Sequence, residues 1–135
     1  MISFSIVINT LNRASLLRKT LQSFRWLKYE GDFEVIVVNG PSTDDTDEVI
    51  SEWRTEIKSG RCEVANLSRS RNVGICMAQG EVVAFIDDDA IPEPEWLTQL
   101  AAAYDSKEIG GAGGGVFDHT GYAFHDKYST GNRLA

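Results

Sequence analysis

Residues 82–89 read Val-Val-Ala-Phe-Ile-Asp-Asp-Asp, a run of apolar residues that is followed at once by three aspartates. An apolar run of this length, rich in β-branched and aromatic side chains, predicts a buried strand at residues 81–86. Adjacent carboxylates repel one another unless water or a cation compensates their charge. Turns favour aspartate, but they seldom hold three in a row directly after such a strand. We therefore expect a charged site at the carboxyl end of this strand.

Short apolar runs that end in polar residues also occur earlier in the chain. Residues 4–8 and 33–38 predict two more strands, and residues 61–67 predict a weaker one. Helical spacing of apolar residues predicts helices between these strands. The expected helices lie at residues 15–28, after the capping residues 42–44, from Ser68 or Ser70 to residue 79, and at residues 95–104. A further strand is expected at residues 115–117.

The alternation of strands and helices predicts an α/β protein with a mostly parallel, Rossmann-like sheet and helices on both faces. Ligands of such sheets bind at the carboxyl ends of the strands. This rule selects three polar segments, which are residues 9–12, 39–44 and 87–89. If the backbone stays extended at the third segment, Asp87 and Asp89 point to one side and Asp88 to the other.

The composition limits the classes of partner. The chain has 135 residues, 13 basic and 20 acidic side chains, and a net charge of −7. This length predicts about one domain, and the acidic balance argues against a nucleic-acid partner. Two cysteines without nearby histidines predict reduced thiols. No apolar run is long enough to span a membrane and no signal peptide is recognised, so we expect a cytoplasmic protein.

Two other features are weak when each is taken alone. Asn39 is typical of a turn, and Arg71 is typical of a solvent-exposed helix face. The glycine-rich residues 110–115 do not match the dinucleotide-binding spacing, because Val116 stands where the last glycine should be. By contrast, the hard carboxylate oxygens of residues 87–89 suit Mg²⁺ or Mn²⁺.

Four segments in this order resemble the inverting family 2 glycosyltransferases, which have the GT-A fold. Residues 7–13, Val-Ile-Asn-Thr-Leu-Asn-Arg, are similar to the family's V-I-P-T-Y-N-R, and residues 37–44 are similar to V-V-D-D-G-S-T-D. Residues 70–75 look like A-R-N-x-G-I, and residues 85–92 resemble F-L-D-x-D-D-x-P with its D-x-D signature. The resemblance covers about residues 1–104.

The resemblance implies a role for each matching residue. Thr10 and Asn12 would line the base pocket, Asn39 would contact the base, and Arg71 would hold the nucleotide and the acidic loop. Among the aspartates, Asp87 would approach the ribose or metal-bound water, and Asp88 fills the variable middle position of a substrate-binding loop. Asp89 would ligate the Mn²⁺ or Mg²⁺ ion that bridges the diphosphate, and Asp87 is the second residue expected at the metal site.

The implied activity is transfer of a sugar from a nucleoside diphosphate sugar, with UDP favoured, to an acceptor hydroxyl with inversion. The acceptor could be a polysaccharide, a lipid-linked glycan or a protein glycan, and the inner face of the membrane is a further expected location. Residues 1–109 are predicted to form the donor-binding subdomain, and residues 110–135 to begin an incomplete acceptor-side region. The family's catalytic carboxylate lies in a later acidic motif, and none follows Asp89. We therefore expect a chain truncated at its C-terminus, with no assigned catalytic base.

Two other functions stay open from the residues alone. A catalytically silent nucleotide-binding module would need the same strand-end site without a base. A metal-dependent phosphohydrolase would use Asp87 as its nucleophile and Asp89 as its acid. That class usually carries its D-x-D after the first strand, whereas here the motif follows the fourth predicted strand.

Overall fold

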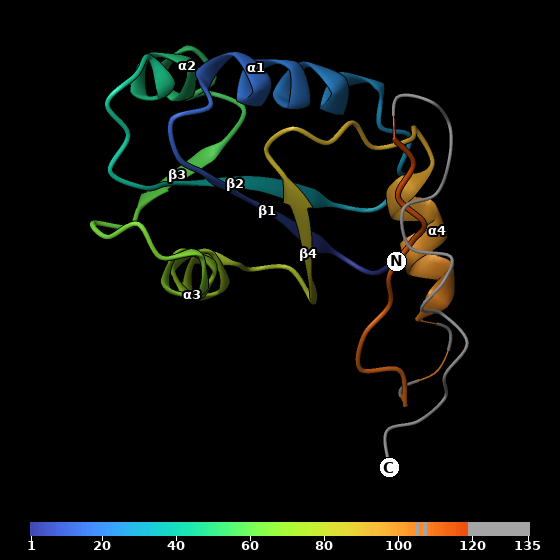
Figure 1. Cartoon of the computed structure of the whole chain (residues 1–135). Helices are drawn as coiled ribbons and strands as arrows, with labels where there is room; N and C mark the ends of the chain where they lie inside the picture. Colours follow the sequence, from blue (N-terminus) through green and yellow to red (C-terminus); the bar gives the residue numbers. More distant parts are fainter. Residues whose placement is uncertain (105, 107, 119–135) are drawn as a thin grey trace.

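The computed structural model describes residues 1–104, 106 and 108–118, and its centre is a parallel four-stranded sheet (Figure 1). The strand order is β3-β2-β1-β4. The strands are β1 (Phe4–Thr10), β2 (Phe33–Asn39), β3 (Lys58–Arg61) and β4 (Val82–Asp87). The predicted α/β fold with a parallel sheet is thus confirmed.

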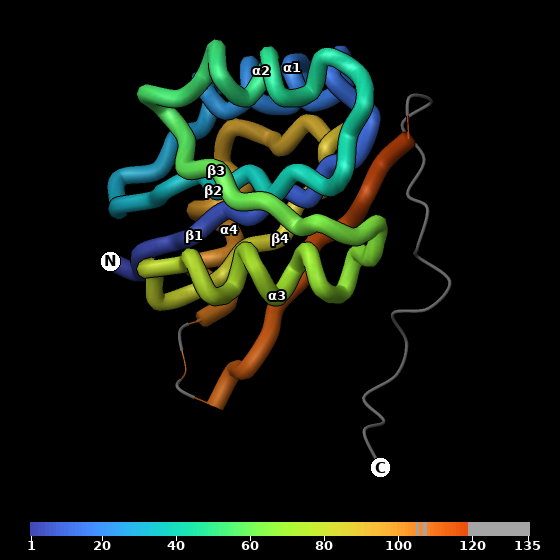
Figure 2. Tube along the Cα trace, turned by 90° about the vertical axis from the view of Figure 1, so that its left-hand side faces the viewer, coloured from blue at the N-terminus to red at the C-terminus, as the bar shows by residue number. Residues whose placement is uncertain are grey.

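Helices cover both faces of this sheet, as Figures 1 and 2 show. They are α1 (Ala14–Ser23), the short 3-10 helix η1 (Phe24–Trp26), α2 (Thr46–Glu52), α3 (Leu67–Met77) and α4 (Trp96–Ala103). Helices α1 and α2 lie on one face and α3 lies on the other. In the described part of the chain, no helix is both long and apolar enough to cross a membrane.

The alternation of side chains along β1 divides the core between the two faces. Phe4, Ile6 and Ile8 are buried in a cluster with residues of α1, α2 and α4, and the intervening Val7 packs in a second cluster with residues of α3. Because both sides of the strand are covered, residues 6–8 of β1 are all apolar instead of alternating with polar residues. The larger cluster therefore fixes α1 and α2 above the strand ends that carry the polar segments.

Several predicted boundaries are wrong. Strand β3 lies at Lys58–Arg61 instead of residues 61–67, and α1 ends at Ser23, with η1 after it. Asn66 instead of a serine caps α3, because its side chain accepts a hydrogen bond from the backbone N–H of Arg69. No strand forms over residues 115–117, where Phe117 alone makes a single β-bridge.

The register of the sheet brings the three polar segments together. Thr10 at the end of β1 is paired with Asn39 of β2, and Asn9 is paired with Asp87 of β4. All three strands are parallel, so their carboxyl ends meet at the same edge of the sheet. The predicted site at this edge is therefore assembled by the fold.

Gly74 allows α3 to approach the sheet closely. A Cβ atom at this position would collide with the side chain of Val7 on β1. Gly74→Ala is expected to destabilise the fold by about 1–2 kcal/mol, because overpacking against a strand outweighs the better helix propensity of alanine. Denaturant unfolding measures the change. Gly110→Ala is the matched control, since a Cβ atom there meets nothing within 4 Å, and an equal loss in both variants would contradict the close approach.

Glu34 lies in a polar network near the amino ends of the strands, at the edge opposite the polar segments. Its Oε1 atom accepts hydrogen bonds from the Ser5 hydroxyl at 2.6 Å and from the backbone N–H of Gln79 at 2.7 Å, and its other oxygen pairs with Lys58. Burial opposes ionisation of Glu34, but these donors outweigh it and lower the pKa of the carboxyl to about 2. The network ties β1, β2 and β3 to the α3–β4 turn.

Because the folded pKa of Glu34 lies below its unfolded value, its stabilising effect is present above about pH 4.5 and is lost as the pH falls toward 2. Glu34→Gln should therefore lower the free energy of unfolding by about 2 kcal/mol at pH 7. The difference from the unsubstituted chain should shrink as the pH falls from about 4.5 to about 2, between the unfolded and the folded pKa of Glu34. Urea unfolding at several pH values measures this, with Glu30→Gln as a control at an exposed position. A difference that does not change with pH would contradict the assignment.

Candidate functional site at the carboxyl ends of the strands

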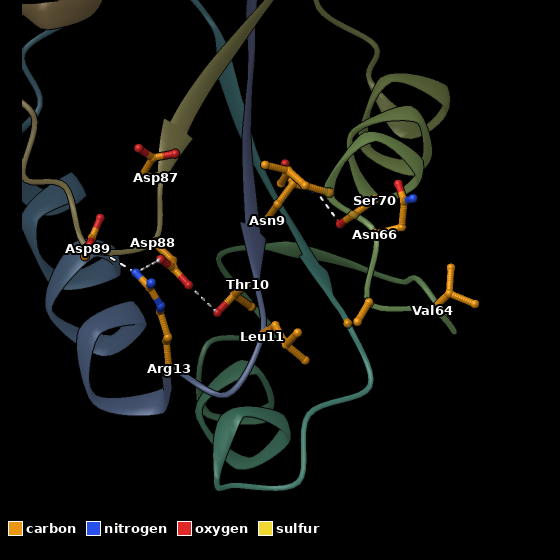
Figure 3. A pocket seen from close by; sticks show the side chains of 13 residues that line it. Asn9, Thr10, Leu11, Arg13, Val64, Asn66, Ser70, Asp87, Asp88 and Asp89 are labelled. Carbon is orange, nitrogen blue, oxygen red and sulfur yellow. Dashed lines mark hydrogen bonds and ion pairs between the residues drawn. The ribbon is translucent and has the colours of Figure 1, made fainter.

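The carboxyl ends of β1, β2 and β4 border a pocket of about 620 Å³ (Figure 3). One wall is the acidic segment after β4, and another is the segment before and at the start of α3. The lining residues are Asn9, Thr10, Leu11, Arg13, Gly40, Val64, Ala65, Asn66, Leu67, Ser70, Asp87, Asp88 and Asp89. Of the predicted site residues, Thr10 and the three aspartates therefore line one pocket.

Asp88 is the buried anchor of the acidic segment. Its carboxylate accepts a hydrogen bond from the Thr10 hydroxyl at 2.8 Å, and its backbone carbonyl accepts one from the Thr20 hydroxyl at 2.9 Å. Burial raises the pKa of Asp88, while the Thr10 hydrogen bond and the positive charge of Arg13 act in the opposite direction. Asp88 is thus held by the protein from several sides, and the Thr10 hydroxyl is occupied in holding it.

Arg13 is a site residue that the sequence did not single out. Its Nη1 atom lies 3.3 Å from Oδ1 of Asp88 and 3.0 Å from Oδ2 of Asp89, so one guanidinium bridges two carboxylates. The dashed lines in Figure 3 show both contacts. The charge balance of the segment could have indicated it, because three adjacent carboxylates need a neighbouring cation.

Asp87 and Asp89 differ in their surroundings. Asp87 is the last residue of β4 and is exposed, and in Figure 3 it lies apart from the Arg13 contacts. The backbone turns after it, with the N–H of Ala90 donating to the Asp87 carbonyl at 3.1 Å. The strand therefore does not continue through Asp89. The prediction that Asp87 and Asp89 point to the same side required an extended backbone, so it does not apply here. Instead, Asp89 shares Arg13 with Asp88, and its side chain is about half exposed.

Asn12 joins two of the polar loops. It has a positive φ of 55°, and its side-chain oxygen accepts a hydrogen bond from the backbone N–H of Thr43 at 2.7 Å. Its own N–H donates to the Ser42 hydroxyl at 2.9 Å. Asparagine tolerates this left-handed conformation better than most residues. Asn12 therefore holds the loop after β1 against the loop after β2 and is not among the residues that line the pocket.

Asp44 completes the junction of these two loops. Its carboxylate accepts hydrogen bonds from the Thr46 hydroxyl and from the backbone N–H of Ala14 at the start of α1. These bonds, the Thr46 hydroxyl first among them, lower the pKa of Asp44. A carboxylate at a helix N-terminus satisfies an N–H group that has no partner within the helix.

Asn39 is turned inward in this structure, and its predicted contact with a base stays a prediction. Asn39 is only 2% exposed. Its Nδ2 atom donates a hydrogen bond to the Asp47 carboxylate at 2.8 Å, and its Oδ1 atom accepts one from the Ser42 hydroxyl at 2.6 Å. Both ends of the amide are therefore engaged with α2 and the loop before it. Asn39 does not line the pocket, and its role in this structure is to hold that loop.

Arg71 is not brought to the acidic segment either. It lies on α3, and its guanidinium carbon sits 5.6 Å from the centre of the Phe85 ring on β4. Arg71 is absent from the pocket lining, and Arg13 instead supplies the cation beside the aspartates. In this structure Arg71 does not contact the acidic segment, and its predicted contact with the nucleotide stays a prediction.

The α3 side of the pocket also contains residues that the sequence did not indicate. The Asn9 side chain donates to the Ser70 hydroxyl at 2.6 Å, which joins the end of β1 to the first turn of α3. Residues 64–67 form the adjoining wall. They carry no charge or recognisable spacing, so only the path of the chain after β3 places them there.

The donor set at the end of β4 fits a divalent cation. Asp87 and Asp89 offer exposed carboxylate oxygens, the ligand type that Mg²⁺ and Mn²⁺ prefer. In the described part of the chain, no three histidine, cysteine, aspartate or glutamate side chains are grouped to hold an ion by themselves. Mg²⁺ commonly binds through one or two carboxylates, with water and substrate phosphates completing its shell. An ion here would therefore need oxygens from a ligand.

Comparison with known proteins decides the family. The family model described as "Glycosyl transferase family 2" matches residues 5–134. The chain belongs to glycosyl transferase family 2. Within this family, the poly(ribitol-phosphate) β-N-acetylglucosaminyltransferase TarS of Staphylococcus aureus is 30% identical over 110 residues, which cover 78% of this chain and 19% of TarS.

Solved structures of other proteins match the fold. TarS 1–349, crystallised in complex with UDP-GlcNAc, has a TM-score of 0.66 and 27% identity, covering 83% of this chain and 36% of that one. The mannosyltransferase PcManGT from Pyrobaculum calidifontis, in complex with GDP-Man and Mn²⁺, has a TM-score of 0.70 at 24% identity, covering 78% of this chain and 33% of that one. The chain thus spans about a third of these two structures, which share its α/β arrangement.

Proposed function

We propose that this chain is the donor-binding part of a metal-dependent, inverting glycosyltransferase, and that its pocket holds a nucleoside diphosphate sugar. The observation that carries the proposal is the acidic segment of Asp87, Asp88 and Asp89, which borders a pocket at the carboxyl ends of parallel strands. Ligands of open parallel sheets bind at this edge. A uridine nucleotide is favoured, because the relative TarS was crystallised with UDP-GlcNAc.

The residues around the pocket have separate tasks in this proposal. Asp89, with its exposed carboxylate, would bind the divalent cation, and Asp87 would face the ribose or a metal-bound water. Thr10, Thr20 and Arg13 hold Asp88 and thereby fix the position of the segment. When bound, Mn²⁺ or Mg²⁺ stabilises the negative charge of a leaving diphosphate. Because Asp88 is held before any ligand arrives, binding has less conformational entropy to overcome at this segment.

Sugar transfer with inversion needs an acceptor hydroxyl that displaces the diphosphate from the opposite side of the anomeric carbon. A general base must take the proton from that hydroxyl. We assign no described residue to this role. Residues 1–109 are proposed to form the donor-binding part, and the chain from residue 110 onward is proposed to begin the acceptor side.

The test is calorimetric titration of the chain with UDP in the presence of Mn²⁺, with UDP plus EDTA and UMP plus Mn²⁺ as comparisons. The proposal expects UDP to bind at least about tenfold more tightly with the metal than without it. UMP should show little metal effect, because it lacks the second phosphate that completes the shell of the ion. Equal affinity for UDP with and without metal would contradict the metal-dependent site.

A further inference from the structure

Arg13 is the only basic residue among the described residues that line the pocket. It lies directly before α1, and its side chain is half exposed. The proposed ligand is a diphosphate, which is strongly anionic. Arg13 therefore faces two kinds of negative group, the aspartates of its own chain and the ligand.

The two aspartates hold Arg13 to different degrees. Asp88 is buried, and its carboxylate also accepts a hydrogen bond from the Thr10 hydroxyl. The Asp88 carboxylate therefore stays in place when the Arg13 guanidinium moves. Asp89 is half exposed, and Arg13, at 3.0 Å, is its one side-chain partner among the described residues. The contact with Asp89 is thus the one that can open without disturbing the buried anchor.

We propose that Arg13 couples metal binding to nucleotide binding by changing partners. In the free chain it bridges Asp88 and Asp89. When Asp89 takes a divalent cation, Arg13 keeps Asp88 and turns its remaining N–H groups to the diphosphate. This inference rests on the proposed function, because it requires that a nucleoside diphosphate and a metal ion share the pocket.

Charge is the reason for the exchange. A cation that takes the Oδ2 atom of Asp89 faces the Nη1 atom of Arg13, which lies 3.0 Å from that oxygen. The two positive groups repel one another, so metal alone should bind weakly. A diphosphate supplies the guanidinium with a new anion of matching, bidentate geometry. Each ligand therefore improves the binding of the other, and such coupling is reciprocal.

The test measures Mn²⁺ binding from the electron paramagnetic resonance signal of free Mn²⁺, without UDP and with saturating UDP. In the unsubstituted chain, UDP should tighten Mn²⁺ binding about tenfold or more. Arg13→Gln should bind Mn²⁺ alone roughly threefold or more tightly than the unsubstituted chain, and the enhancement by UDP should fall below about threefold. A purely structural role for Arg13 would weaken both measurements, and a role limited to pairing with Asp89 would leave the enhancement by UDP unchanged.

Arg18→Gln is the matched control. Arg18 lies on α1, and its guanidinium pairs with the Glu52 carboxylate at 2.9 Å. Neither residue lines the pocket. Both measurements should be unchanged in it. Arg13→Lys keeps the charge but not the planar fork, so it should bind metal alone as weakly as the unsubstituted chain and lose part of the UDP enhancement. Circular dichroism checks that each variant is folded.

Unchanged Mn²⁺ affinity and unchanged UDP enhancement in Arg13→Gln would overturn the coupling. If Arg13→Gln does not fold, Arg13→Lys tests the coupling instead. An undiminished enhancement of Mn²⁺ binding by UDP in Arg13→Lys would then overturn the coupling. Absence of any UDP binding by the unsubstituted chain in the presence of Mn²⁺ would overturn the proposed function itself. That result is distinct from UDP binding that does not depend on Arg13.

Discussion

Asp89→Asn should weaken UDP binding in the presence of Mn²⁺ about 100-fold, or roughly 2.7 kcal/mol. The substitution removes the charge of the proposed metal ligand, and an amide oxygen is a much poorer ligand for a hard divalent cation. Its effect on folding should be small, since Asp89 is half exposed and its ion pair with Arg13 is solvent-accessible. Calorimetry with UDP and Mn²⁺ measures the affinity, and urea unfolding measures the stability.

Glu93→Gln is the control for Asp89→Asn, because Glu93 is another exposed acid after β4 and does not line the pocket. It changes the net charge of the chain by the same amount. A tenfold or greater loss of UDP affinity in the control would mean that the overall charge, and not the position of Asp89, governs binding. An affinity within about twofold of the unsubstituted chain in Asp89→Asn would remove that residue from the site.

Asp88 should show the opposite pattern, with its main effect on stability. Asp88→Ala is expected to lower the free energy of unfolding by about 2–3 kcal/mol, because it leaves the buried Thr10 hydroxyl without its partner and removes one ion pair of Arg13. Asp88→Asn should cost about 1 kcal/mol or less. The amide can keep a hydrogen bond to Thr10, and burial already disfavours the charge of the carboxylate, as the raised pKa of Asp88 indicates.

Chemical denaturation of the two Asp88 variants decides between an anchor and an ordinary surface acid. Asp87→Ala is the neighbouring control, with an expected change within about 0.5 kcal/mol because its side chain is exposed. If Asp88→Ala were as stable as Asp87→Ala, Asp88 would not hold the segment. If Asp88→Asn were as unstable as Asp88→Ala, the charge would matter more than the hydrogen bond to Thr10.

The apolar runs explain how much of the fold the sequence could predict. Strands β1, β2 and β4 each contain three or more consecutive apolar residues that are followed directly by a polar residue. Strand β3 is an edge strand of sequence Lys-Ser-Gly-Arg, with mostly exposed side chains, and it carries no such pattern. The prediction therefore moved that strand toward Cys62 and Val64, the nearest apolar residues.

The sequence predicted which polar segments lie together at one edge of the sheet, but not the contacts that their side chains make. The rule for strand ends needs only the order of the elements, and the edge that it selected carries a pocket lined by Thr10 and residues 87–89. Whether Asn39 faces a ligand depends on Ser42 and Asp47, which occupy its amide. The pairing of Arg13 with Asp88 joins residues 75 positions apart, and no local pattern reveals such a contact.

We propose that the carboxyl ends of the strands hold the metal and the nucleotide together. Nuclear magnetic resonance tests this directly, because bound Mn²⁺ broadens the backbone amide signals of nearby residues, and the spectra are recorded with UDP bound. Broadening falls off steeply with distance from the ion. The proposed site predicts that signals of residues 9–13 and 87–90 disappear first at low Mn²⁺, and that those around Glu34 and Gln79, at the opposite edge, persist. Broadening that centres away from residues 87–90, or that is the same with and without UDP, would contradict it.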